Sequence, residues 1–467
     1  MLFSSISFLY YFLPITLILY FLVPRSCKNL VLLISSLFFY FWGEPVYSLL
    51  MIGSALSGYI HGRLIEKAKG TKYAKVPLIT SIVISLGLLC FFKYSNFFIE
   101  NINALFHSDF ALLKLTLPIG ISFYTLQTLS YTIDVYRGDA KVQKNFIHFA
   151  TYVSLFPQLL AGPIVRYQTI QDELEHRKST IADTAYGISR FMEGLFKKCI
   201  LSNTLAELVM KLENGNEASV AAYWAMSIAF TLQIYFDFSG YSDMAIGLGR
   251  IFGFHFLENF NYPYLSKSIS EFWRRWHMSL GTWFRDYVYI PLGGNRVPLG
   301  RWFLNIFVVW FLTGFWHGAQ WNFIVWGLYF AFFLLIEKLF INNLLDKLPK
   351  FVRHIYVLFF INISFVIFNH DTMAEIGRFL GGMFGAGGIP LTNRFSAYYI
   401  SSYGFVLLLS AFLATPALKH ILAKLRATKP GEYALAVLEP VAYAGILLLV
   451  TASLVNGSFN PFLYFRF

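Results

Sequence analysis

Long apolar runs dominate the chain, and short polar stretches separate them, many with glycine or proline. Several runs approach or exceed the roughly 20 residues that an α-helix needs to cross a bilayer. The apolar runs are residues 6–23, 30–42, 47–59, 76–92, 115–135, 221–236, 303–316, 321–336, 355–368, 403–413 and 435–454. They predict an all-α polytopic membrane protein with roughly 10–12 membrane helices, some too short to span alone. The short, interrupted runs are predicted to be re-entrant or half-membrane elements, whose backbone needs protein or a water-filled cavity around it.

Composition supports this interpretation. Of the 467 residues, 57% are hydrophobic and 13% are charged, and the mean hydropathy is +0.57. A soluble globular domain carries about 25% charged residues, so the chain is predicted to be an integral membrane protein. No hydrophilic stretch is long enough to fold separately. We therefore expect a single membrane-embedded domain over residues 1–467, with the chemistry-bearing motifs in residues 117–327.

The formal net charge of +12 arises from Lys and Arg, many of which collect in short loops. Basic residues dominate at Arg25 and Lys28, in residues 62–75 and in residues 267–301. Because basic loops stay on the cytoplasmic side, these three places are predicted to face the cytoplasm. Two interpretations of the charge stay open: the side chains contact lipid headgroups, or some of them receive a polyanionic substrate.

The sequence lacks the motifs of several classes of protein. Cys27, Cys90 and Cys199 have no paired spacing, so neither a disulfide framework nor a metal cluster is indicated. The sequence contains no Walker-type loop, no dinucleotide fingerprint and no His-Glu-x-x-His helix. The absence of a clear internal repeat weakens a secondary-transporter interpretation. We expect no metal site and no permanently bound cofactor.

Polar residues interrupt the apolar pattern first in residues 117–138. The segment is predicted to break at Pro118 and Gly120, and polar side chains then recur at offsets of three and four along one helix face. That face either makes hydrogen bonds to other helices or lines a polar passage.

A second motif, residues 158–167, places Gly162 and Pro163 at the end of an apolar run, with Arg166 after them. This pattern predicts a bent segment near the membrane interface. Arg166 is a candidate contact for an anion.

The third motif is FDFSGYSDMAIG, residues 236–247. Asp237, Tyr241 and Asp243 surround Gly240 and are too polar to face lipid, so they should face protein or an aqueous cavity. The two acids either form a proton pair, or they cap a helix and bond backbone freed by a break at Gly240.

The fourth motif, WRRWHMSLGTWFRDYVYIPLGGNR, residues 273–296, alternates tryptophan, arginine and tyrosine, as an amphipathic segment at the membrane interface does. It contains His277, Trp283 and Arg285. The fifth, TGFWHGAQWNFIVWG, residues 313–327, follows an apolar run and carries His317.

His317 is the main candidate for function. A titratable imidazole at membrane depth is costly unless it has a partner or a role, so it marks a functional site by default. The alternative is a histidine that only bonds a carbonyl group. The remaining histidines, His370 among them, lack such surroundings and are interpreted as interfacial or packed residues.

The FDFSGYSD, WRRWHMSLGTWFRDYVYIPLGGNR and WHGAQWNFIVWG strings resemble the membrane-bound O-acyltransferases, specifically the branch that modifies bacterial polysaccharides. That branch includes proteins of alginate and peptidoglycan O-acetylation and of D-alanyl transfer to teichoic acid. The terminal FNPFLYFRF, residues 459–467, is more similar to the first two. The resemblance implies a ring of helices around a central passage, with a cytoplasmic funnel for the donor and an outer opening for the acceptor.

The family's signature residues carry over onto two histidines. The histidine of its Trp-His-Gly motif, regarded as catalytic, falls on His317, and a second functional histidine falls on His277. The histidine that often follows in a Trp-Gly-x-x-His-Gly motif is absent, because Phe330 occupies that position. Further candidates to contact substrate or line the passage are Trp316, Asn322, Asp237, Tyr241, Trp283, Arg285 and Arg166.

An acyl thioester is already activated, so its transfer to a hydroxyl needs mainly a base and an oxyanion donor. We assign His317 as the base, and His277 either orients or polarises the reactants or is structural. The resemblance implies a multi-pass protein of the bacterial cytoplasmic (inner) membrane that takes acetyl groups from a cytoplasmic thioester, acetyl-CoA. A periplasmic or extracellular esterase-like partner then places them on a polysaccharide such as peptidoglycan or alginate. Membrane lipids surround the chain, and no nucleic-acid partner is expected.

Two alternatives stay open. The chain could transfer D-alanine to teichoic acid from a carrier-protein thioester, or it could be a non-enzymatic transporter of polysaccharide or lipid. A transporter would lose little when His317 becomes alanine.

Overall fold

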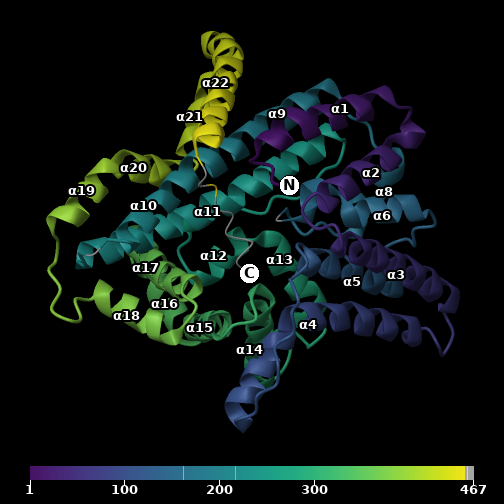
Figure 1. Cartoon of the computed structure of the whole chain (residues 1–467), viewed down its shortest axis with the longest axis horizontal. Coiled ribbons are helices and arrows are strands. Elements are labelled where there is room, and N and C mark those ends of the chain that lie inside the picture. The colour runs from purple at the N-terminus through teal and green to yellow at the C-terminus, as the bar shows by residue number, and fades with distance from the viewer. Residues whose placement is uncertain (161, 216, 458–459, 461–467) are drawn as a thin grey trace. The chain divides into compact units, whose positions relative to one another are not determined.

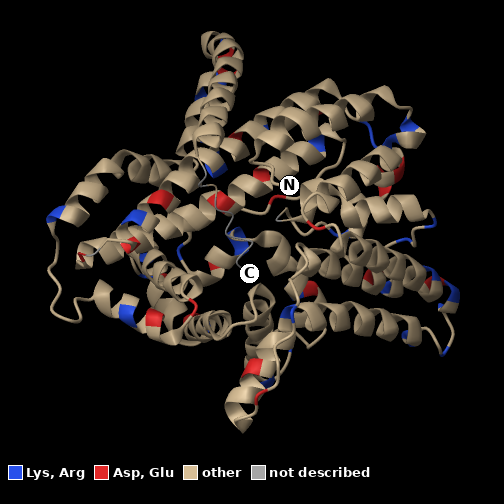
Figure 2. Ribbon diagram, in the orientation of Figure 1, with Lys and Arg blue, Asp and Glu red and all other residues tan. Residues whose placement is uncertain are grey.

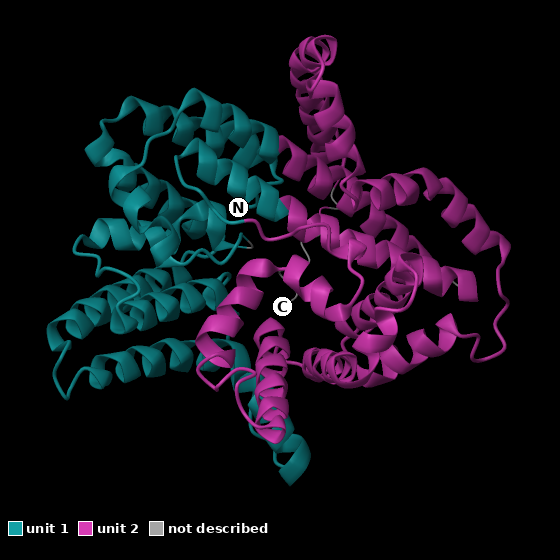
Figure 3. Cartoon of the chain, turned by 180° about the vertical axis from the view of Figure 1, so that it is seen from behind, with its two compact units in different colours: residues 1–191, 241–257 teal, residues 192–240, 258–467 magenta. Residues whose placement is uncertain are grey.

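The computed structural model describes the chain except residues 161, 216, 458–459 and 461–467, so most of the terminal FNPFLYFRF motif lies outside the described residues. The described residues form helices and connecting segments, with no strand among them. They divide into two compact units, residues 1–191 with 241–257, and residues 192–240 with 258–467 (Figure 3). The single domain over residues 1–467 stays a prediction.

The first unit contains the N-terminal helices (Figure 1). In it, α3 packs against α4, α5 and α6, and α2 packs against α6. Its elements are η1 (Phe8–Phe12), α1 (Leu13–Leu22), η2 (Arg25–Cys27), α2 (Lys28–Phe41), α3 (Tyr47–Ala68), α4 (Lys75–Phe106), α5 (Ile121–Arg137), α6 (Phe146–Ser154), α7 (Phe156–Leu159), α8 (Tyr167–His176), most of α9 (Ile181–Phe196) and the end of α11 (Val220–Ile251).

The second unit begins at the end of α9 and includes most of α11. Its remaining elements are η3 (Lys197–Ser202), α10 (Asn203–Glu213), η4 (Pro263–Leu265), α12 (Ile269–Arg275), α13 (Met278–Phe284), η5 (Arg285–Tyr289), α14 (Leu299–His317), α15 (Trp321–Ile336), η6 (Glu337–Ile341), α16 (Asn342–Leu345), α17 (Lys350–Asn369), α18 (Met373–Met383), α19 (Arg394–Ser402), α20 (Gly404–Leu413), α21 (Ala417–Arg426) and α22 (Lys429–Asn456). In this unit α15 packs between α14 and α17.

Every apolar run identified in the sequence lies largely on a helix, as predicted. Among the described residues, five helices are long and apolar enough to cross a membrane: α4, α14, Trp321–Leu345 through α15 to α16, α17 and α22. The pair α19 and α20, bent by 51°, would make a sixth. Most of the ribbon in Figure 2 is tan, because charged residues are sparse. The chain is therefore an all-helical, multi-pass membrane protein, while 10–12 crossings stay a prediction.

The two predicted chain breaks have different outcomes. α5 begins at Ile121, directly after Gly120, whose φ of +78° is accessible to glycine and unfavourable for other residues. The break at Gly240 was predicted wrongly, because α11 runs through it without interruption. A Cβ on Gly240 would lie 2.8 Å from the Gly194 carbonyl oxygen and 3.0 Å from the Lys198 nitrogen. Gly240 therefore permits close packing against the end of α9 and η3.

Each acid of α11 pairs with a basic side chain within its own unit. In the second unit, Lys198 Nζ lies 2.5 Å from Asp237 Oδ1, and the two side chains are 1% and 4% exposed. In the first unit, Arg190 lies 2.7 Å from Asp243. Both acids lie inside the helix, so the expectation that they cap it or bond a broken backbone was wrong. The structure gives each of them an ionic partner instead.

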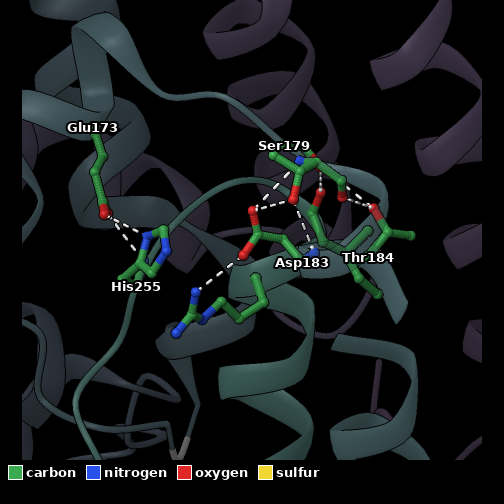
Figure 4. A network of polar contacts seen from close by, with 8 residues as sticks. Glu173, Ser179, Asp183, Thr184 and His255 are labelled. Carbon is green, nitrogen blue, oxygen red and sulfur yellow. Dashed lines mark hydrogen bonds and ion pairs between the residues drawn. The ribbon is translucent and has the colours of Figure 1, made fainter. Parts of the chain in front are cut away.

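A polar network holds the end of α11 within the first unit (Figure 4). Glu173 of α8 lies 2.6 Å from the Nδ1 atom of His255, and Asp183 of α9 lies 3.1 Å from Arg250. The Ser179 hydroxyl donates to the Ile251 carbonyl at 2.7 Å. These contacts fix the segment that follows α8 against the C-terminal end of α11.

Glycine allows α14 and α15 to approach each other closely in the second unit. A Cβ on Gly314 would overlap the Phe323 carbonyl oxygen, and one on Gly327 would overlap the Trp310 carbonyl oxygen. Such small-residue contacts are a common way for membrane helices to associate, because lipid supplies no hydrophobic drive between them. The contact sets the position of the C-terminal turn of α14, which ends at His317.

We expect Gly327→Leu to destabilise the protein by about 1–3 kcal/mol or more, because the added side chain forces α14 and α15 apart. The thermal midpoint in detergent, followed by size-exclusion chromatography, measures this effect. Gly445→Leu in α22 is the matched control, because a Cβ there meets no atom within 4 Å. Equal midpoints for the two variants would show that the close approach is unimportant.

Replacing Lys198 by Met should cost about 3–5 kcal/mol of stability, because Asp237 is left as a buried charge without its base. The double variant with Asp237→Leu should recover most of that loss. Thermal unfolding of both variants tests this prediction. Lys211→Met is the control, because its pair with Glu207 is more than one-third exposed and such pairs contribute about 0–1 kcal/mol. A single Lys198 variant as stable as this control contradicts the prediction.

Candidate active site around Trp316

His317 is the last residue of α14, and aromatic rings surround it. Its ring centre lies 5.0 Å from Trp316, 5.1 Å from Trp326 and 5.5 Å from Phe368, each at a steep interplanar angle. Trp326 comes from α15 and Phe368 from α17, so the close approach of α14 and α15 contributes directly to this wall. The imidazole is 9% exposed. The wall restricts both its rotation and its access to water.

Asn322 connects the beginning of α15 with the end of α17. Its Nδ2 atom donates to the Phe368 carbonyl at 3.4 Å, and the residue is fully buried. This contact holds the backbone of the residue whose ring faces His317. Asn322 therefore supports the wall through the Phe368 backbone, and its predicted contact with substrate stays a prediction.

His277 lies between α12 and α13 and reaches the same tryptophan. Its ring centre is 6.2 Å from that of Trp316 and 4.7 Å from that of Phe238 of α11. The imidazole is 2% exposed. Trp316 thus contacts the rings of both His277 and His317, and the second unit alone brings together the two histidines that the sequence singled out.

The electrostatic environment keeps His277 neutral. His277 lies outside the candidate membrane spans, yet burial lowers its pKa to about 3, because charging the ring in an apolar site is unfavourable. Its Nδ1 atom lies 3.2 Å from the Oδ1 atom of Asn259. Asn259 was missed in the sequence, where no motif distinguishes it from its neighbours.

The other candidates of the second unit have contacts of their own. Asp237 is occupied by its ion pair with Lys198, and its neighbour in the chain, Phe238, contacts His277. Trp283 is buried in α13 and packs against Tyr287 at 5.1 Å. The Arg285 side chain is 59% exposed and pairs with Asp286 at 2.6 Å. Roles for Trp283 and Arg285 in binding substrate stay predictions.

Two candidates belong to the first unit. Tyr241 is buried and stacks on Phe3, with ring centres 4.5 Å apart and planes inclined by 11°. Arg166 directly precedes α8, at the end of the bent segment that the sequence predicted. The functions of both residues stay predictions.

Both interpretations of the polar face of α5 also stay open. On that helix the buried Gln127 amide has no hydrogen-bond partner among the described residues.

A separate cavity of about 270 Å³ lies in the second unit beside the ends of α10, α11 and α18. His370, which the sequence suggested was interfacial or packed, lines this cavity, two residues after the Phe368 that contacts His317. Its Nδ1 atom lies 2.9 Å from the Val366 carbonyl oxygen. Charged and aromatic side chains on the wall include Glu213, Glu217, Tyr223, Glu375, Arg378 and Phe379.

Comparison with known proteins identifies the family of the chain. Residues 138–370 match the model of the MBOAT, membrane-bound O-acyltransferase family. A probable alginate O-acetylase AlgI of Azotobacter vinelandii is 38% identical, with all of both chains covered. The peptidoglycan O-acetyltransferase of Helicobacter pylori is 34% identical over 84% of this chain and 81% of that protein. The teichoic acid D-alanyltransferase of Bacillus subtilis is 31% identical over 46% of this chain and 57% of that protein.

The matched region includes both histidines and the four aromatic residues described around them. Similarity at this level over the full length is sufficient to assign the family. The chain therefore belongs to the membrane-bound O-acyltransferase family and is an O-acyltransferase.

Proposed function

We propose that the protein takes acetyl groups from acetyl-CoA at the cytoplasmic side of a bacterial inner membrane and transfers them across it, for O-acetylation of a polysaccharide. The observation that carries this proposal is that the rings of His277 and His317 both contact Trp316. The alginate and peptidoglycan relatives match most or all of the chain, whereas the D-alanyltransferase matches less than half of it. That difference favours acetyl transfer over D-alanyl transfer from a carrier protein.

His317 acts as the general base in this proposal. It takes the proton of the acceptor hydroxyl while the hydroxyl oxygen attacks the thioester carbonyl carbon. The tetrahedral intermediate then collapses, the carbon–sulfur bond breaks, and the thiolate takes the proton from the imidazolium. The products are an ester and free thiol. A wall of Trp316, Trp326 and Phe368 excludes water, which would otherwise hydrolyse the thioester.

The acceptor lies on the outer side of the membrane. A periplasmic or extracellular esterase-like partner receives the acetyl group or presents the polymer hydroxyl, and alginate and peptidoglycan are the candidate polymers. The basic side chains within residues 62–75 and 267–301 face the cytoplasm in this arrangement, where they attract the phosphates of the donor.

His317→Ala should lower thiol release from acetyl-CoA by about 10²-fold or more, because general-base help is worth about 10²- to 10⁴-fold. Purified protein in nanodiscs, with a hydroxyl acceptor and a thiol-reactive dye, gives the rate. His420→Ala, in the exposed part of α21, is the matched control and should retain full activity.

Equal activity of the His317 and His420 variants would exclude His317 as the base. Release of thiol from a D-alanyl carrier protein, but not from acetyl-CoA, would show that the donor assignment is wrong and would favour the D-alanyl alternative.

A further inference from the structure

Asn259 is fully buried and contacts three consecutive residues, His277 before α13 and the first two residues of that helix. Its Oδ1 atom lies 3.2 Å from His277 Nδ1, 3.2 Å from the Ser279 backbone nitrogen and 2.9 Å from Ser279 Oγ. Its backbone carbonyl also accepts from the Met278 nitrogen at 2.9 Å. One asparagine therefore holds both the backbone of these residues and the ring of His277.

The Ser279 contact decides which Asn259 atom faces the imidazole. A backbone N–H group is only a donor, so the amide atom that faces it must be the oxygen. The same oxygen faces His277 Nδ1, and two lone pairs would repel each other at that distance. Nδ1 of His277 therefore carries the proton and donates it to Asn259, while Nε2 keeps its lone pair.

The Nε2 atom of His277 is buried and has no hydrogen-bond partner in the part of the chain that the structure describes. A buried acceptor left without a partner costs stability, which is a reason to look for its role. The low pKa of the ring keeps it neutral, so Nε2 stays an acceptor at the pH of a living cell.

The backbone of His277 is strained and is held by hydrogen bonds. His277 has φ +45° and ψ +52°, a left-handed conformation that is unfavourable for a residue with a Cβ. The contact of Met278 with the Asn259 carbonyl and that of Gly281 with the His277 carbonyl, at 3.1 Å, hold this conformation. Strained residues of this kind cluster at functional sites.

We propose that Asn259 is a positioning residue that holds His277 as the Nδ1–H tautomer, so that Nε2 accepts a hydrogen bond from an O–H or N–H group of the substrate. This inference rests on the proposed transferase function and separates two roles that the sequence left open for His277. An acceptor orients a hydroxyl or amide group, whereas polarising a carbonyl oxygen needs a donor. The group that it orients belongs either to the acceptor, as the hydroxyl, or to the donor, as an amide N–H of the pantetheine arm.

Three variants of the full chain test the inference. Asn259→Leu removes the accepting oxygen at similar volume, and Asn259→Asp keeps an oxygen in its place. Asn261→Ala is the matched control, because Asn261 lies two residues away in the same segment and is exposed. Thermal midpoints of all three are measured first, so that turnover is compared only between folded proteins.

The tautomer is read by ¹⁵N NMR of histidine-labelled protein, with His277→Gln to assign the signals. Wild type, Asn261→Ala and Asn259→Asp should show a protonated Nδ1 for His277, and Asn259→Leu should lose this signature. This measurement is independent of activity. A wild-type protein whose His277 carries its proton on Nε2, or an Asn259→Leu variant with an unchanged tautomer, would overturn the inference even if transferase activity is confirmed.

Turnover gives the second readout. Asn259→Leu should lower kcat/KM by about 10- to 100-fold, by analogy with the loss of a partner that orients a metal-binding histidine. Asn259→Asp should retain at least tenfold more activity than Asn259→Leu. A rise in KM for acetyl-CoA assigns the oriented group to the donor, and a fall in kcat or a rise in KM for the acceptor assigns it to the hydroxyl. Equal losses in the Leu and Asp variants would overturn the inference. An inactive wild type with the Nδ1–H tautomer contradicts the proposed function but leaves the tautomer assignment in place.

Discussion

The close backbone contact between α14 and α15 is the constraint on which the site of the second unit depends. Lipid does not drive two apolar helices together, so van der Waals contact between backbones has to do so. Gly314 and Gly327 permit that contact because neither carries a Cβ. The contact brings Trp326 against His317, and the packing of α17 on α15 then adds Phe368. The aromatic wall therefore depends on two glycines that lack a Cβ atom.

The wall of this site consists of aromatic rings, and this apolar surface determines the environment of the histidines. In an apolar, water-poor environment a neutral imidazole is favoured over a charged one, and a hydrogen bond is stronger than in water. The neutral His277 ring can therefore accept a hydrogen bond with little competition from solvent. Lys198 and Asp237 pair with each other, and burial accounts for the lowered pKa of His277.

The sequence identified the helices and both histidines but not the support around them. Apolar runs predict helices because their length and composition leave few other structures in a membrane, and the Gly120 break was predicted because proline and glycine occur together there. The break at Gly240 was predicted wrongly because a glycine that allows a turn and one that allows close packing look the same in a sequence. Asn259 could not be predicted, because its role depends on a left-handed residue at position 277, which sequence pattern does not indicate.

The wall around His317 also has a consequence for how the protein is made. Domains generally begin to fold from the N-terminus while synthesis continues. A growing chain carries both histidines once α14 is complete, but Phe368 arrives only with the last turn of α17. Until then the imidazole lacks one side of its enclosure, and the Asn322 contact that anchors this side has no partner. The order of residues along the chain therefore delays completion of the aromatic enclosure of His317 until Phe368 has been synthesised.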